Sequence, residues 1–320
     1  MIRLGLVVCM LLGASASTAA DLRGTWDAEA KEGDPARIQF SLKARKNGNM
    51  GMGIPLSDFT GLTWDQVRSA ARTPVHFTMR REAGTIEFDG TFRDEQGAGD
   101  FVFTPDPAYA GKLNRLGLRL DDDSDERELL TMTLFDVSTS FIRSMQDIGY
   151  KVGLQKYVEF RIFKVNPAYV KAMADVGFPH LSADKLVETK IHDVSPEYIR
   201  DMRAHGEDLP LSEYIQSRIF QVTPEFAAEM EKLGYRGLDR DQLVQFKIHG
   251  VSPEFIGELR TLGYAHVPAD DLVAMRIHGV TPEFIRRVEK AGYHKVPVEK
   301  LVQMRIFDID PEMVEALDRH

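Results

Sequence analysis

The chain has 320 residues and a formal net charge of −9 at neutral pH. This length leaves room for more than one domain, and the acidity argues against nucleic acid or an anionic membrane surface as the main partner. Cys9 is the only cysteine and lies near the start, so the rest of the chain has no disulfide and no thiolate for catalysis or metal binding.

Residues 1–20 have the pattern of a secretory signal peptide. Arg3 supplies a positive start, an apolar run follows, and Thr18, Ala19 and Ala20 offer the small residues of a cleavage site. The apolar run is shorter than the ~20 residues that cross a bilayer, and no later run is long enough. We therefore expect cleavage after Ala20 and a periplasmic or secreted protein without a membrane span.

Residues 21–105 are predicted to form an antiparallel β domain. Apolar and polar residues alternate, as at Ile38, Phe40 and Leu42, and glycine-rich turn signals separate the alternating segments. Six or seven short strands in about 85 residues suggest a small barrel or sandwich. Four aromatic residues of this domain either line a ligand cavity or fill the core, namely Trp26, Phe40, Phe77 and Phe88.

Residues 106–320 repeat one pattern at intervals of 28–32 residues. A hydrogen-bonding side chain precedes a proline position, as in Ser252 and Pro253, and glycine follows that position by ten residues. Such a side chain caps a helix, proline fits the first helical position, and glycine ends the helix in a left-handed conformation. A second amphipathic segment follows each glycine, as at 269–277.

Each repeat is therefore predicted to be a pair of helices. A pair this short cannot bury its apolar faces alone, so neighbouring repeats must stack. We predict seven two-helix repeats and a terminal half-unit that caps the core, forming an α-solenoid. With the β domain in front, the fold class is α+β.

No catalytic, cofactor or metal motif is present in the sequence. His192, His249 and His278 stand at equivalent places in three repeats, but other repeats have phenylalanine there, which favours a space-filling ring over a metal ligand. The acidic run 121–125 lacks the ligand spacing of a calcium loop and is predicted to be a solvated loop. We expect no enzyme, no cofactor and no bound metal.

The repeats at 272–279 and 279–285 resemble those of exported bacterial proteins of unassigned function. They are also similar to the tails attached to membrane metallopeptidases of the beta-lactam-sensor type, and residues 54–62 resemble the β-rich segment that accompanies such arrays. The resemblance implies a β-rich segment followed by helical repeats over nearly all of the mature chain. The His-Glu-x-x-His motif of those peptidases is absent here, so neither proteolysis nor any functional residue is implied.

Two functions from different classes fit these features. The first is a non-enzymatic interaction protein whose stacked helices bind a protein or peptide. Tyr235, Tyr264 and Tyr293 each follow a helix-ending glycine, and they either belong to this surface or pack against the preceding helix. The second is small-ligand or lipid binding by the β domain, with the array as a scaffold.

A ladder of ion pairs is predicted between the repeats. A basic residue stands near the end of each second helix, and a glutamate follows seven positions later, near the start of the next repeat. The pairs are Lys190 with Glu197, Arg218 with Glu225, Lys247 with Glu254, Arg276 with Glu283, and Arg305 with Glu312. Each basic residue also lies near the C-terminus of its helix, and each glutamate near the N-terminus of its helix, where the helix dipole stabilises these charges. Direct pairing predicts distances within about 4 Å in at least three of the five pairs.

Overall fold

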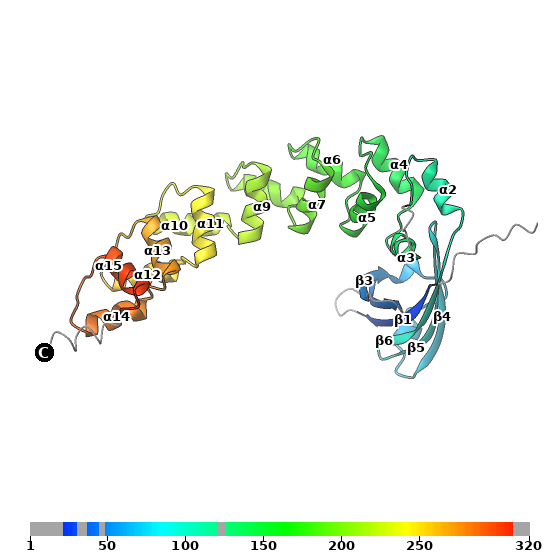
Figure 1. Ribbon diagram of the computed structural model, residues 1–320, viewed down its shortest axis with the longest axis horizontal. Helices are drawn as coiled ribbons and strands as arrows, with labels where there is room; N and C mark the ends of the chain where they lie inside the picture. The colour runs from blue at the N-terminus through cyan, green and yellow to red at the C-terminus, as the bar shows by residue number, and fades with distance from the viewer. Residues whose placement is uncertain (1–21, 31–36, 45–48, 121–125, 310–320) are drawn as a thin grey trace, which may run out of the picture. The chain divides into compact units, whose positions relative to one another are not determined.

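The computed structural model describes residues 22–30, 37–44, 49–120 and 126–309 (Figure 1). The predicted signal peptide, the acidic run 121–125 and the terminal half-unit with Glu312 lie outside these residues. An antiparallel sheet comes first and a series of helices in a repeated arrangement follows, which confirms the predicted α+β class. No helix in the described ranges is both long and apolar enough to cross a membrane.

Six strands form one sheet, in the order β3-β2-β1-β6-β5-β4, with every neighbouring pair antiparallel. They are β1 (Leu22–Ala30), β2 (Arg37–Ala44), β3 (Asn49–Pro55), β4 (Thr73–Arg81), β5 (Gly84–Arg93) and β6 (Gln96–Pro105). A 3-10 turn, η1 (Leu56–Asp58), and a short helix, α1 (Trp64–Val67), connect β3 to β4. The side chains of Thr63 and Gln66 form the predicted capping box of α1.

The sheet curls strongly enough for distant strands to share one core. Phe40 on β2 and Phe77 on β4 have ring centroids 6.1 Å apart, although β1, β6 and β5 lie between their strands. In a flat sheet with strands ~4.8 Å apart, the two strands would be separated by about 19 Å. The structure is therefore a single curled sheet, which is closer to the predicted barrel than to a sandwich of two sheets.

The first pair of helices contributes to the core of the sheet. This pair is α2 (Tyr109–Asn114) and α3 (Glu126–Leu134). Leu130 and Leu134 of α3 are buried in the same apolar cluster as the aromatic rings of the strands. The chain divides into two compact units, residues 1–167 and 168–320, called here the N-terminal and C-terminal units.

The remaining helices alternate between the first helix of a repeat, helix A, and the second, helix B. The A helices are α4 (Thr139–Asp147), α6 (Pro167–Asp175), α8 (Pro196–Ala204), α10 (Pro224–Lys232), α12 (Pro253–Thr261) and α14 (Pro282–Lys290). The B helices are α5 (Leu154–Ile162), α7 (Ala183–Ile191), α9 (Leu211–Phe220), α11 (Arg240–His249), α13 (Ala269–Ile277) and α15 (Val298–Ile306). Within the C-terminal unit, α9, α11, α13 and α15 contact one another in turn, and α12 contacts α14.

The helix ends form as the sequence predicts. Side-chain oxygens of Ser195, Thr223, Ser252 and Thr281 accept hydrogen bonds from the backbone N–H three residues later. The glycines after the A helices have φ angles between 87° and 100°, in the left-handed region that a side chain disfavours; they are Gly149, Gly177, Gly206, Gly234, Gly263 and Gly292. Local hydrogen bonding therefore sets where each A helix begins and ends.

Candidate functional site: an exposed isoleucine row

The last turn of every B helix in the C-terminal unit carries an isoleucine that faces solvent. The exposed fractions are 53% for Ile191, 46% for Ile219, 47% for Ile248, 54% for Ile277 and 51% for Ile306. The residue five positions earlier is buried in each helix: Leu186, Tyr214, Leu243, Leu272 and Leu301. We call the five exposed side chains the isoleucine row. Repeated exposure of large apolar side chains at equivalent positions makes the row a candidate interaction surface.

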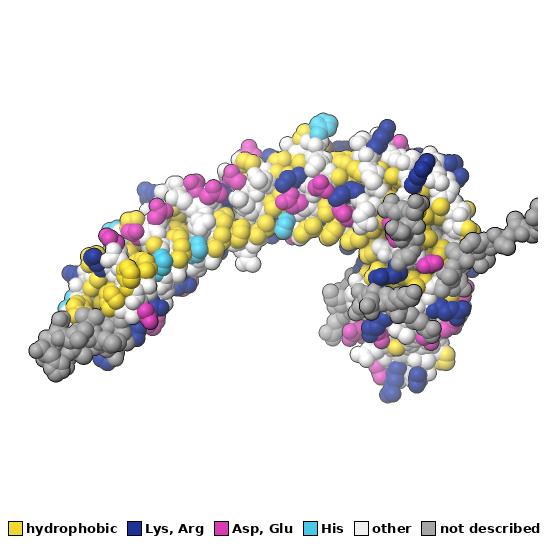
Figure 2. Space-filling view, viewed as in Figure 1, with side chains coloured by type: hydrophobic (Ala, Val, Ile, Leu, Met, Phe, Trp, Pro, Cys, Tyr) yellow, Lys and Arg dark blue, Asp and Glu magenta, His cyan; other side chains and the backbone are white. Residues whose placement is uncertain are grey.

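An aromatic ring follows each isoleucine of the row and borders it. The rings belong to His192, Phe220, His249, His278 and Phe307. They are half-buried or exposed, and Phe307 is 71% exposed. Figure 2 shows hydrophobic side chains gathered in a band over the B helices α9, α11 and α13, with histidines along it. Within the described part of the chain, no group of three or more His, Cys, Asp or Glu residues is placed to hold a metal ion.

The stacking of the B helices sets the spacing of the row. Packed helices lie ~8–10 Å apart, so neighbouring isoleucines repeat at about that interval from α9 to α15. Four isoleucines, Ile219, Ile248, Ile277 and Ile306, therefore extend over about 25–30 Å. A surface of this form suits a long, narrow partner rather than a small molecule.

A basic residue precedes each isoleucine and lies over an aromatic ring of helix A in the same repeat. The cation is 3.9 Å from the ring centre for Lys190 and Tyr169, 4.3 Å for Arg218 and Tyr198, 4.0 Å for Lys247 and Phe226, 5.0 Å for Arg276 and Phe255, and 5.2 Å for Arg305 and Phe284. These are cation–π distances, so the pair joins helix A to helix B. Sequence reasoning did not identify these pairs.

The arginines of this series also bind the preceding repeat. Nε of Arg276 donates to the His249 carbonyl at 3.1 Å, and Nε of Arg305 donates to the His278 carbonyl at 3.4 Å. Arg218 donates in the same way to the carbonyl of Asp193. Each arginine therefore ties its own two helices to the end of the previous B helix.

The predicted ion-pair ladder is wrong. Among the described residues, no salt bridge joins Arg218 to Glu225, Lys247 to Glu254 or Arg276 to Glu283. Three of the five predicted pairs therefore do not form. The remaining two would fall short of the three that the prediction requires, so the prediction fails. The reason is the direction of the side chains, because each cation lies over a ring of helix A in its own repeat, and the arginines also bind the preceding repeat.

The glutamates are explained by their own helix ends. Hydrogen bonds from the backbone N–H at the helix start, and then from the capping hydroxyl, lower the pKa of Glu225 and Glu283. At Glu254 the Ser252 hydroxyl contributes most to the lowering of the pKa. Glu197 also pairs with Arg200 of its own helix at 3.2 Å. The stabilisation is therefore local to each N-terminus.

The tyrosines considered for the interaction surface are packing residues. Tyr235 donates its hydroxyl hydrogen to the Val267 carbonyl at 2.9 Å, and Tyr264 donates to the Val296 carbonyl at 2.7 Å. Both carbonyls belong to the next repeat. Burial raises the pKa of both phenols. These two rings and that of Tyr293 are half-buried against the apolar cluster of the C-terminal unit, which favours the packing alternative over the interaction surface.

The aromatic residues considered as ligand-lining in the β domain fill its interior. Trp26, Phe40, Phe77 and Phe88 are fully buried, and their ring centroids lie 4.7–6.3 Å apart. The Trp26 indole N–H lies 3.2 Å and 3.1 Å from the carbonyls of Asp89 and Asp100. A ligand in this interior would have to displace rings that already contact one another, so these residues form a core.

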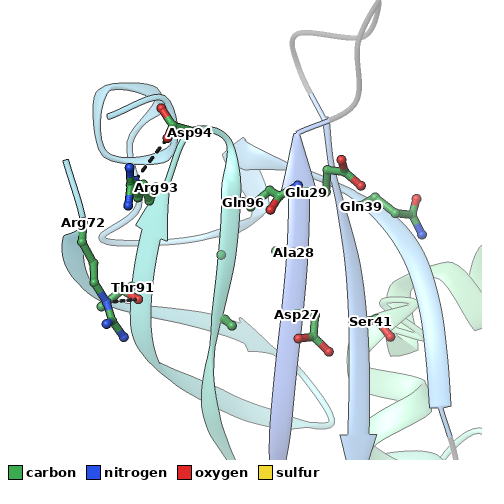
Figure 3. Close-up of a pocket in the computed structure, with 12 residues that line it drawn as sticks. Asp27, Ala28, Glu29, Gln39, Ser41, Arg72, Thr91, Arg93, Asp94 and Gln96 are labelled. Atoms are coloured by element: carbon green, nitrogen blue, oxygen red, sulfur yellow. Dashed lines mark hydrogen bonds and ion pairs between the residues drawn. The ribbon is translucent and has the colours of Figure 1, made fainter. Parts of the chain in front are cut away.

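The outer face of the sheet carries a hollow of about 870 Å³ (Figure 3). Its floor includes Gly97 and Ala98, and its charged rim is already paired, as between Arg93 and Asp94 at 3.2 Å. A Cβ at Gly97 would point to the inner face, 2.5 Å from the ring of Phe92, so the packing of the core accounts for this glycine.

Comparison with models of protein families, with curated proteins and with solved structures finds no match. The isoleucine row was present in the sequence as an identical residue beside each basic position, including Ile162 in the N-terminal unit. Sequence reasoning missed it because apolar residues at helical spacing were assigned to the core. Only the exposed fractions distinguish this position from the buried leucine five residues earlier.

Proposed function

We propose that this protein is a non-enzymatic binding protein whose C-terminal unit holds a protein or peptide along the isoleucine row. The observation that carries the proposal is the row itself, with five isoleucines that are each about half exposed. Full burial of an isoleucine contributes ~1.5–3 kcal/mol, so completing the burial of one half-exposed side chain contributes about 1 kcal/mol.

Five such contacts contribute about 5 kcal/mol, which is at the lower end of the ~4–15 kcal/mol that association costs. The row therefore supports a reversible contact only if the bordering rings and polar groups contribute as well. This requirement favours an extended partner that touches several repeats at once over a ligand that touches one.

We place the protein in the periplasm or outside the cell. The support is the signal-peptide pattern of residues 1–20. Partners are then sought among exported proteins and peptides.

The proposal is tested by capture from an extracytoplasmic extract with the intact chain, followed by titration of the purified partner. The double variant Ile248→Ser and Ile277→Ser should weaken the affinity at least tenfold, which is ~1.4 kcal/mol. Ile148→Ser is the matched control, since Ile148 is an isoleucine of similar exposure, 43%, outside the row. A partner that binds the double variant and the intact protein equally well contradicts the proposal, and so does the absence of any saturable partner.

A further inference from the structure

The residue two positions after the isoleucine position of helix B, which is Leu134 in α3, differs between repeats in its ability to pair with the next basic residue. In the N-terminal unit, Asp136 holds this position and pairs with Arg161 at 3.0 Å. In the C-terminal unit, Asp193 pairs with Arg218 at 2.6 Å. The same position is occupied by Gln221 before Lys247, by Gly250 before Arg276 and by Gly279 before Arg305.

Within the described ranges, the later cations have no carboxylate partner. Arg276 and Arg305 use Nε for a carbonyl, and no Asp or Glu of the described residues lies within 4.0 Å of either guanidinium or of Lys247. The free edge of the Arg276 guanidinium lies over Gly250, where a Cβ would stand 2.8 Å from one of its terminal nitrogens. The absence of a side chain at Gly250 therefore lets the guanidinium lie against the backbone, where the earlier repeats have the carboxylate of an aspartate.

These cations alternate with the exposed isoleucines. Lys247, Arg276 and Arg305 directly precede Ile248, Ile277 and Ile306, so cation and apolar side chain recur together in three successive repeats. The protein as a whole is acidic, with a net charge of −9. Three cations without a carboxylate partner among the described residues thus lie beside the exposed isoleucines, and cations complement carboxylates.

The spacing of the repeats selects the conformation of the partner. A polyproline II segment has three residues per turn and rises ~3.1 Å per residue, so every third side chain lies on one face at ~9.3 Å intervals. Stacked helices lie ~8–10 Å apart, which matches this interval. A β-strand does not match as well, because side chains three residues apart point to opposite faces.

We propose that the surface from Lys247 to Phe307, which includes the last three isoleucines of the row, binds an extended acidic segment of polyproline II form. This segment has an apolar and an acidic side chain in every three residues. The apolar side chains cover Ile248, Ile277 and Ile306, and the carboxylates bind the open edges of the cations. This inference rests on the proposed function and names the chemistry of its partner.

The test measures fluorescence anisotropy of a labelled synthetic peptide, (Leu-Asp-Pro)4, with the intact protein at low ionic strength, where screening is weak over ~30 Å. Peptides with Asn or Lys in place of Asp, and one with an extra Ala in each repeat, are the comparisons. The acidic peptide should bind about tenfold more tightly than the Asn peptide and should weaken as salt is added. The net negative charge of the protein repels an acidic peptide, so tighter binding of the acidic peptide would have to come from local contacts with the cations.

Two variants locate the contact. Gly250→Asp supplies Arg276 with the partner that Arg161 and Arg218 already have, and aspartate takes a positive φ at this place, 51° in Asp136 and 54° in Asp193. It should reduce affinity for the acidic peptide about fivefold and leave the Asn peptide unaffected. Arg276→Gln should act similarly, and it keeps the test valid if Gly250→Asp unfolds.

The control variant is Arg236→Gln, because Arg236 is exposed and lies in a turn outside the row. Binding of the Asn or Lys peptide as tight as that of the acidic peptide overturns the inference and leaves the proposed function standing. Binding of the off-register peptide with equal affinity overturns the polyproline II match. No binding of any peptide in the panel overturns the inference, while the capture experiment still decides the proposed function.

Discussion

Replacing Leu272 and Ile277 separately by alanine distinguishes the core from the row within one helix. Leu272 is fully buried and Ile277 is 54% exposed, although both lie in α13. Truncating a buried leucine costs ~2–5 kcal/mol of unfolding free energy. Only about half of Ile277 leaves water on folding, so its truncation should cost about 1 kcal/mol.

Urea unfolding followed by far-UV circular dichroism measures the difference. With a slope of ~3 kcal/mol/M, the Leu272→Ala midpoint should fall by about 1 M and the Ile277→Ala midpoint by about 0.3 M. Repeat arrays can unfold in parts, so the slopes of the variants must agree before the midpoints are compared. A loss for Ile277→Ala as large as that for Leu272→Ala would refute the reasoning, because it would place the row in the core.

Tyr264→Phe removes the hydrogen bond to Val296 and should cost about 1 kcal/mol of unfolding free energy. An unchanged urea midpoint would contradict the packing role of this tyrosine. Ser252→Ala removes a helix cap and should also cost about 1 kcal/mol, measured in the same way. Asp89→Asn should lower the pKa of His76 measured by NMR, because the hydrogen bond and charge of Asp89 raise it. The raised pKa of His76 stabilises the folded protein below the unfolded-state pKa of histidine, and this stabilisation is lost as pH rises through the folded-state pKa. Asp89→Asn should therefore lower stability below the unfolded-state pKa and leave it unchanged well above the folded-state pKa. Deleting residues 308–320 should lower stability or solubility, and unchanged melting would contradict the expected capping role.

The repeats and their helix ends could be predicted from the sequence because they depend on contacts between residues close in the chain. The Ser252 side chain reaches a backbone N–H three residues away, and Gly263 supplies a left-handed φ of 88° directly after its helix. Alternation of apolar residues likewise assigned Phe40 and Phe77 to the inner face of the sheet. These features need no knowledge of what packs against them.

The partners of the charged residues could not be predicted in the same way. Seven residues separate Arg276 from Glu283, and 27 separate it from the His249 carbonyl that it binds. Sequence distance favours the glutamate, but stacking of the repeats brings the carbonyl and the Phe255 ring to the guanidinium. The direction of a long side chain therefore depends on tertiary structure.

Tertiary structure also decided which apolar residues are covered. Helical periodicity indicates the apolar side of a helix but not how far its neighbours extend over it, so Leu272 and Ile277 look alike in sequence. In the β domain, alternation showed which rings point inward, while the curl of the sheet determined that they fill the interior. Local hydrogen bonding and periodicity thus set the elements, and packing between them left the isoleucine row about half exposed, because the neighbouring helices cover Leu272 completely and Ile277 only in part.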